Sequence, residues 1–146
     1  MNKRIIIVLA IVILLLTGCN NKIQKQENLK ESEEIINNMN IVINEKEYKL
    51  NLENNKTVTE LLTKLPLQLN MNDLNNNEKY VYLDFSLKNN PVNPKHINKG
   101  DVMLYTDNCL VIFYKSFDTS YSYTKIGHIN NLPDLDTNFV SVKLQI

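Results

Sequence analysis

The chain has 146 residues and a formal net charge of zero. Acidic and basic side chains also nearly cancel within its C-terminal part, which gives no electrostatic reason to expect nucleic acid as a partner. Only three glycines occur, and they form no phosphate-binding loop, so nucleotide hydrolysis is not expected.

The N-terminus has the pattern of a secretory signal. Lys3 and Arg4 precede an unbroken apolar run over residues 5–16. This run is shorter than the roughly 20 residues that a membrane-spanning helix needs, and it falls in the range of roughly 7–15 residues typical of a signal peptide. We therefore predict a signal peptide over residues 1–18.

The signal ends in Leu16-Thr17-Gly18-Cys19, which closely resembles the bacterial lipobox. The resemblance implies that the thiol of Cys19 takes a diacylglyceryl group and that the mature chain begins there. Two or more acyl chains attach a protein stably to a membrane, whereas one holds it only marginally. We expect a lipid-anchored protein on the extracytoplasmic face of the cell membrane. An ordinary signal peptide with a chance cysteine and an uncleaved anchor are the alternatives.

Residues 19–38 are polar and contain no aromatic side chain. Such a segment cannot bury enough apolar surface to offset the entropy lost on ordering, so we interpret it as a tether. The remaining residues, 39–146, have the length of one small domain. Because Cys19 is expected to carry lipid, Cys109 has no disulfide partner, and we expect a small buried hydrophobe there.

Most of the domain is predicted to be strand. Segments 39–44 and 47–52 alternate around a turn and offer Ile41, Ile43, Tyr48 and Leu50 to one face. A helix follows, with Thr57 and Glu60 as a capping box, and it ends before Pro66. Further strands are predicted at 66–71, 79–85, 101–106, 109–114, 120–126 and 139–146, with a long loop over 89–100. About eight strands and one or two short helices favour a small barrel or sandwich.

Several local features recur together in one known group of proteins. They are a leucine-rich helix running into Leu65-Pro66, the strand start Glu78-Lys79-Tyr80, the turn Gly100-Asp101, and the segment 119–124 leading to Gly127. With these features the domain resembles the bacterial cyclophilin-like domain family. The resemblance implies a mainly β fold, a small closed eight-stranded barrel with one or two short helices. It also implies a concave face like the one on which cyclophilins hold proline peptides.

The resemblance does not extend to isomerase chemistry. Prolyl isomerisation by cyclophilins depends on an arginine that hydrogen-bonds the substrate near the proline amide, and Arg4 is the only arginine here. A lysine does not reproduce the planar donor fork of arginine. We expect a binding module without catalysis. A weak, arginine-free prolyl isomerase acting on secreted proteins and a scaffold for another envelope protein are the alternatives.

Other catalytic chemistry has little support. His96 and His128 have no cysteine, histidine or carboxylate at metal-ligand spacing, so neither a metal site nor a cofactor is expected. A nucleophilic pair of Cys109 and His128 is conceivable, since such groups meet in space rather than in sequence, but nothing local supports it. We assign no catalytic residue.

Aromatic side chains concentrate in FYKSFDTSYSYTKIG, residues 113–127. Alternation places Tyr121 and Tyr123 on one face of the predicted strand. These tyrosines either pack in the core, with hydroxyls bonded at its edge, or line a shallow groove for an extended peptide or a small ligand. The predicted groove consists of Glu78, Tyr80, Tyr105, Phe113, Phe117, Thr119, Tyr121 and Tyr123.

Overall fold

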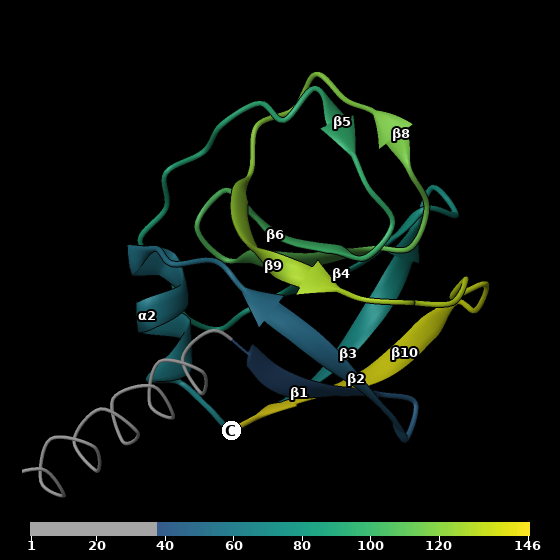
Figure 1. Cartoon of the computed structure of the whole chain (residues 1–146), viewed down its shortest axis with the longest axis horizontal. Helices are drawn as coiled ribbons and strands as arrows, with labels where there is room; N and C mark the ends of the chain where they lie inside the picture. The colour runs from purple at the N-terminus through teal and green to yellow at the C-terminus, as the bar shows by residue number, and fades with distance from the viewer. Residues whose placement is uncertain (1–37) are drawn as a thin grey trace, which may run out of the picture. The chain divides into compact units, whose positions relative to one another are not determined.

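The computed structural model describes residues 38–146, and the predicted signal peptide, the lipidation site Cys19 and residues 19–37 of the tether lie outside the described residues. Eight strands close into an antiparallel barrel, and a two-stranded sheet and a short helix complete the fold (Figure 1). The barrel strands are β1 (Asn38–Ile43), β2 (Lys46–Leu52), β3 (Leu67–Leu74), β4 (Glu78–Tyr82), β6 (Asp101–Tyr105), β7 (Cys109–Phe113), β9 (Thr124–Ile129) and β10 (Phe139–Gln145).

Around the barrel the strands follow the order β1-β10-β3-β4-β7-β6-β9-β2. This closed eight-stranded architecture confirms the predicted fold class, and within residues 38–146 it is accompanied by a single helix. Closure leaves no free sheet edge, so every barrel strand has two hydrogen-bonded neighbours.

The first hairpin forms as its sequence pattern predicts. β1 and β2 pair in register from Asn38 with Asn51 to Ile43 with Lys46. Asn44 and Glu45 make the connection with positive φ angles of 46° and 68°, the conformation that a tight two-residue hairpin requires.

Helix α2 (Lys56–Leu62) begins differently from the prediction. Asn55 is the N-cap, and its side-chain oxygen accepts a hydrogen bond from the Val58 amide at 2.9 Å. The predicted capping box is therefore wrong. Thr57 donates instead to the Lys88 carbonyl at 2.6 Å, and the Glu60 carboxylate accepts from the Lys88 amide at 2.8 Å. Both side chains thus bind the backbone of Lys88 to the helix. They are free to do so because Asn55 caps the helix, and asparagine is as good an N-cap as threonine.

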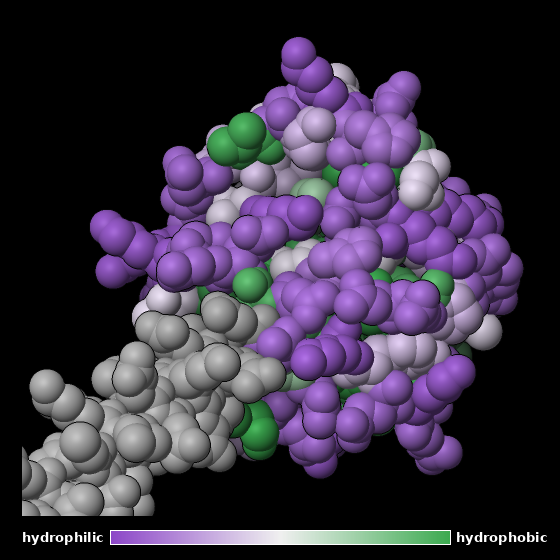
Figure 2. All heavy atoms as spheres, in the orientation of Figure 1, coloured by the Kyte–Doolittle hydropathy of each residue, from purple (hydrophilic) through white to green (hydrophobic). Residues whose placement is uncertain are grey.

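In the part of the chain that the structure describes, no helix is long and apolar enough to cross a bilayer. The face shown in Figure 2 is mainly hydrophilic, with hydrophobic side chains in small separate groups. The apolar residues instead form two buried clusters, one inside the barrel and one on its outer face.

Strand β7 contributes to both clusters. Leu110 and Ile112 point into the barrel, whereas Cys109, Val111 and Phe113 point outward, as alternation along a strand requires. All five residues are buried. The predicted buried, unpaired thiol at the head of this strand is thus confirmed.

The outer cluster is covered by a segment that was predicted as a plain loop. Residues 89–100 contain β5 (His96–Ile97), which pairs antiparallel with β8 (Phe117–Asp118). Figure 1 shows these short strands together beyond β6 and β9. Ile97 and Phe117 pack over the outward side chains of β7. This two-stranded flap gives the barrel its second core.

Strand β9 starts later than predicted. It begins at Thr124, and residues 119–122 lie outside any strand. The Tyr123 backbone instead forms a bridge with Val92, with hydrogen bonds of 2.9 and 3.0 Å. The amide of Tyr121 donates to the Thr119 hydroxyl at 3.1 Å. Because these groups bond elsewhere, the alternating serines and tyrosines do not extend the barrel strand.

Candidate ligand-binding site

A pocket of about 440 Å³ lies over the outward side chains of β4, β6 and β7. This volume is within the usual range of small-molecule sites, roughly 300–1,000 Å³. Cross-strand neighbours form its floor, since Tyr80 lies opposite Val111 and Tyr82 opposite Cys109. We call it the tyrosine pocket, after its six aromatic lining residues Tyr80, Tyr82, Tyr105, Phe117, Tyr121 and Tyr123.

Most of the predicted groove residues meet in this pocket. Glu78 and five of the predicted aromatic residues line it. Phe113 does not, because it is fully buried beneath, with its ring 5.7 Å from that of Phe117 and 5.5 Å from that of Tyr123. Thr119 is also outside the lining, and its hydroxyl holds the turn before Tyr121. That these residues bind a ligand stays a prediction.

Six lining residues were not predicted as part of the groove: Leu74, Asn75, Asn77, Tyr82, Cys109 and Val111. Tyr82 lies two positions after Tyr80 on the same strand, so alternation alone places it on the same face. Asn77 immediately precedes β4, and Cys109 was predicted as buried but not as part of a site. The signal for Tyr82 was therefore available, whereas the roles of Asn77 and Cys109 depend on the tertiary fold.

The sequence left open whether Tyr121 and Tyr123 pack in the core or line a groove, and the structure places the two differently. Tyr123 is 8% exposed and packs in the outer cluster, with its ring 5.6 Å from that of Tyr105. Tyr121 is 61% exposed, and its ring meets that of Tyr105 edge-on at 6.1 Å. Tyr123 is thus a core residue that forms a wall, and Tyr121 forms an open rim.

Glu78 is an acidic residue of this pocket whose surroundings disfavour its charged form. Burial, together with the negative charge of Asp73, raises the pKa of Glu78 to about 7. Within residues 38–146 no lysine or histidine forms an ion pair with it. A carboxyl whose charge is disfavoured and unpaired is the type of group found at functional sites.

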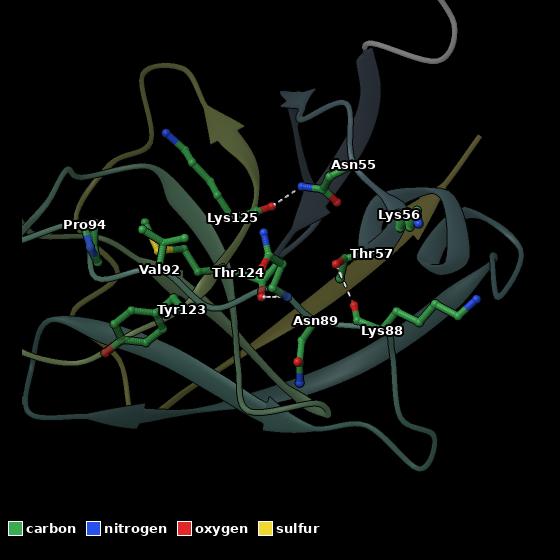
Figure 3. A pocket seen from close by; sticks show the side chains of 12 residues that line it. Asn55, Lys56, Thr57, Lys88, Asn89, Val92, Pro94, Tyr123, Thr124 and Lys125 are labelled. Carbon is green, nitrogen blue, oxygen red and sulfur yellow. Dashed lines mark hydrogen bonds between the residues drawn. The ribbon is translucent and has the colours of Figure 1, made fainter.

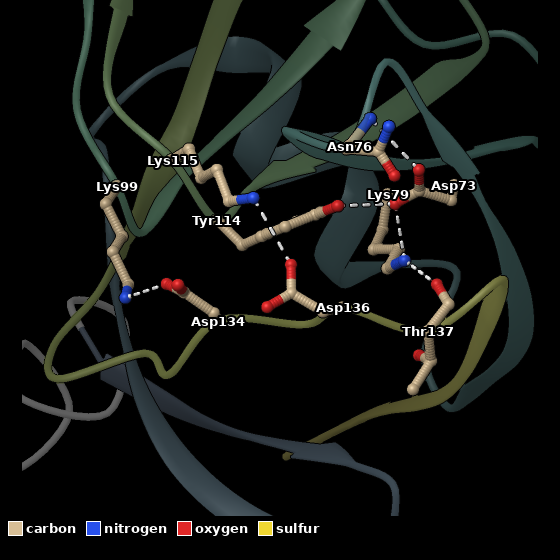
Figure 4. A network of polar contacts seen from close by, with 9 residues as sticks. All are labelled: Asp73, Asn76, Lys79, Lys99, Tyr114, Lys115, Asp134, Asp136 and Thr137. Atoms are coloured by element: carbon tan, nitrogen blue, oxygen red, sulfur yellow. Dashed lines mark hydrogen bonds and ion pairs between the residues drawn. The ribbon is translucent and has the colours of Figure 1, made fainter.

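Lys79, the residue after Glu78, belongs to a partly buried network of polar contacts, which Figure 4 shows. Lys79 is fully buried, its Nζ lies 2.6 Å from the Asp73 carboxylate, and it also donates to the carbonyl of Thr137. The Tyr114 hydroxyl donates to the same carboxylate at 2.6 Å. Burial alone would raise the pKa of Asp73, but the hydrogen bonds from Lys79 and Tyr114 outweigh it and hold that pKa below its usual value. Asp73 is therefore ionised at neutral pH, where Glu78 is only partly ionised.

A second, larger cleft of about 830 Å³ lies on the other side of Tyr123, between the start of α2 and residues 88–94. Its walls are tied together by side-chain to backbone hydrogen bonds (Figure 3). Thr57 bonds the Lys88 carbonyl, and Asn55 donates to the Lys125 carbonyl at 2.8 Å. Because its polar groups already bond one another, we consider the tyrosine pocket the better candidate for a ligand site.

Comparison with known proteins agrees with the barrel fold. The model of the cyclophilin-like family matches residues 41–145. The chain belongs to the cyclophilin-like family. The solution structure of a hypothetical protein from Archaeoglobus fulgidus is similar, with a TM-score of 0.51 and 18% identity, over 74% of this chain and 92% of that one. An identity this low supports the shared fold alone. The search of curated proteins found no match.

This cyclophilin-like chain has no arginine in the domain, because Arg4 is the only arginine in the sequence. The residues of the tyrosine pocket offer hydroxyl, amide and carboxyl groups, none of which is a planar cationic fork. The pocket lining therefore contains no group that matches the arginine of the isomerases.

The conceivable pair of Cys109 and His128 does not form. In this cyclophilin-like barrel Cys109 lies opposite Tyr105 and His128 lies opposite Asp101, at the two ends of β6, which are about 13 Å apart at the rise of a β-strand. Burial and the charge of Glu78 also raise the pKa of the Cys109 thiol to about 11. A thiol with so high a pKa is a poor nucleophile at neutral pH.

Each histidine does have one carboxylate partner. The Nδ1 atom of His128 lies 3.1 Å from buried Asp101, and that of His96 lies 2.6 Å from Asp118 across the β5–β8 pair. These partners are far away in sequence, which is why spacing did not predict them. Among residues 38–146 no three metal-ligating side chains gather at one point.

Proposed function

We propose that this protein is a lipid-anchored, extracytoplasmic member of the cyclophilin-like family that binds a peptide or a small ligand without catalysing its conversion. The observation that supports this function is the tyrosine pocket, in which six aromatic side chains surround the unpaired carboxyl of Glu78. Such a carboxyl lowers the stability of the free protein at neutral pH, and a bound ligand offers a reason for its presence.

The position of the pocket supports binding of this kind. Its floor lies on three neighbouring barrel strands, and sites built on strands hold their geometry better than sites on loops. Its rim consists of exposed rings, since Tyr82 and Tyr121 are 65% and 61% exposed. Tyrosine offers a large contact area and a polar tip at a small entropic cost. A rigid floor and accessible aromatic rims suit a ligand that enters from solvent.

Ligand binding is tested by screening small-molecule fragments and short peptides against the isotope-labelled chain by NMR. We expect hits that shift resonances of Tyr80, Tyr105 and Tyr121. Tyr121→Ala should weaken such hits by at least about fivefold, with a change in unfolding free energy of no more than about 0.5 kcal/mol. Phe139→Ala removes an equally exposed ring from β10 and should leave the hits unchanged. A screen whose hits all map elsewhere would refute the proposed site.

Anchoring is tested separately by metabolic labelling with a radioactive fatty acid. Cys19→Ala should abolish the label and leave an unprocessed precursor. Cys109→Ala is the matched control, because its thiol is buried in the domain and should not affect labelling. Normal processing and retained label in Cys19→Ala would refute the lipoprotein proposal and leave the binding proposal untouched.

A further inference from the structure

We infer that the tyrosine pocket recognises a primary ammonium group, with Glu78 as the counter-charge and the surrounding tyrosine rings as its walls. The inference rests on the proposed function and names the chemical class of the ligand. Three properties of the pocket support it: its charge, its unoccupied aromatic faces, and its hydrogen-bond acceptors.

The first property is charge. Glu78 is the one residue of the pocket lining that carries a formal charge, and no lysine, arginine or histidine of residues 38–146 lines this pocket. Nearby Asp73 already has Lys79 as its partner, at 2.6 Å. A cation that enters the pocket would therefore meet an uncompensated carboxylate, and an anion would be repelled by it.

The second property is the state of the aromatic rings. Four lysines in the described domain lie over aromatic rings. One lies over Tyr48, one over Phe85 and two over Tyr114. None of these four contacts uses a ring of the tyrosine pocket. The pocket rings therefore offer faces that no lysine of the described domain occupies, and such faces attract an ammonium group that comes within about 6 Å.

The third property distinguishes a primary ammonium from a quaternary one. The side-chain oxygen of Asn77 is buried and accepts no hydrogen bond within the described residues, and Asn77 lines the pocket beside Glu78. Buried acceptors of this kind normally have a donor. A primary ammonium brings three N–H donors, which suit the carboxylate and, when the Asn77 side chain turns toward the ligand, the amide oxygen as well. A quaternary ammonium has no donor to offer either.

The pH response of this site follows from the groups around Glu78. They are Asp73 on β3, Tyr80 and Tyr82 on β4, Tyr105 on β6, Cys109 on β7, and Tyr121 and Tyr123 before β9. Asp73 is held ionised by its hydrogen bonds, and burial keeps Cys109 and Tyr123 protonated. Ionisation of Glu78, with a pKa of about 7, therefore controls binding of a cation. Affinity for the ammonium should fall by about tenfold from pH 8 to pH 6.

The test is an NMR titration of the full chain in detergent micelles with two matched probes. Nα-acetyl-lysine amide carries a butylammonium side chain, and Nα-acetyl-norleucine amide is nearly the same molecule without the ammonium group. At pH 8 the lysine probe should bind at least about tenfold more tightly, with shifts at Tyr80 and Tyr121. Glu78→Gln should remove this preference, whereas Glu47→Gln, an exposed change on β2, should preserve it.

Further probes identify the source of the group and its donors. Tighter binding of the lysine probe than of butylamine would support a peptide lysine as ligand, and the reverse order would support a small amine. Tetramethylammonium should bind more weakly than butylamine, and equal binding would overturn the primary-ammonium assignment. Equal or tighter binding of the norleucine probe, or no saturable binding of either amine, would overturn the inference. The proposed function would still stand if uncharged fragments bound in the pocket.

Discussion

Replacing Glu78 with glutamine should make the domain more stable at pH 8 and leave its stability at pH 4.5 nearly unchanged. Glu78 has a pKa of about 7 in the folded state, against a usual value of 4.5. Between these two values the folded chain keeps a proton that the unfolded chain has released, so the free energy of unfolding falls as the pH rises. Glutamine is neutral throughout this window and removes the penalty.

The size of the effect follows from the two pKa values. Each pKa unit corresponds to about 1.4 kcal/mol of differential interaction, which gives an upper limit of about 3–4 kcal/mol for the full window from 4.5 to about 7. Because the pocket is open to water on one side, solvent screening lowers this figure, and we expect about 2 kcal/mol. Nearly all of the loss should occur between pH 4.5 and pH 8.

Urea unfolding followed by circular dichroism at pH 4.5, 6 and 8 measures the difference between the two chains. The curves for the native chain and Glu78→Gln should diverge steadily as the pH rises. Glu47→Gln, which removes an exposed carboxylate, should follow the native chain at every pH within about 0.5 kcal/mol. Parallel curves for Glu78→Gln and the native chain would show that Glu78 ionises normally, and the electrostatic argument for the pocket would fail.

Three further predictions concern the buried ion pair, the glycine in β9 and catalysis. Lys79→Met should reduce the free energy of unfolding by about 3–5 kcal/mol, because it leaves Asp73 without its buried partner. The control Lys115→Met affects a half-exposed pair with Asp136 and should reduce it by at most about 1 kcal/mol. Similar losses for the two variants in chemical denaturation would contradict this prediction. Gly127→Ala should lower stability by about 1–3 kcal/mol, because a Cβ atom there would lie 2.2 Å from the Asn51 carbonyl oxygen, and an unchanged melting temperature would mean that β2 and β9 separate easily. Exchange NMR on an Ala-Pro peptide should show no cis–trans exchange peaks at sub-second mixing times, since uncatalysed isomerisation takes tens to hundreds of seconds; their appearance would establish an isomerase.

The barrel was predictable because its strands are specified locally. Alternating apolar residues and a turn define β1 and β2, and the burial of Ile41, Ile43 and Leu50 follows that pattern. The start of β9 was not predictable in this way. Residues 120–122 alternate as a strand does, but they do not pair with β6. The backbone of Tyr123 pairs with Val92 instead, so β9 begins only at Thr124. A distant partner decided the boundary, and a local pattern carries no information about it.

The candidate site was predictable in its aromatic members and not in its electrostatics. Tyr121 belongs to the aromatic run over residues 113–127, and Tyr80 and Tyr105 lie in predicted strands from which they were assigned to the groove. The burial of Lys79 is not predictable in this way, because a lysine in an alternating strand is normally solvated, and its partner Asp73 reaches it only through the pairing of β3 with β4. Burial raises the pKa of Glu78, and the same strand pairing brings the negative charge of Asp73, which raises it further.

Strand β7 is buried on both of its faces, so its inward and outward residues can change independently as such proteins diverge. Its outward residues Cys109 and Val111 form the bottom of the tyrosine pocket, while Leu110 and Ile112 belong to the barrel interior. A larger or smaller side chain at either outward position would change the depth of the pocket and leave the inner packing intact. Selection for a new ligand and selection for a stable barrel can therefore act on alternate residues of the same five-residue strand.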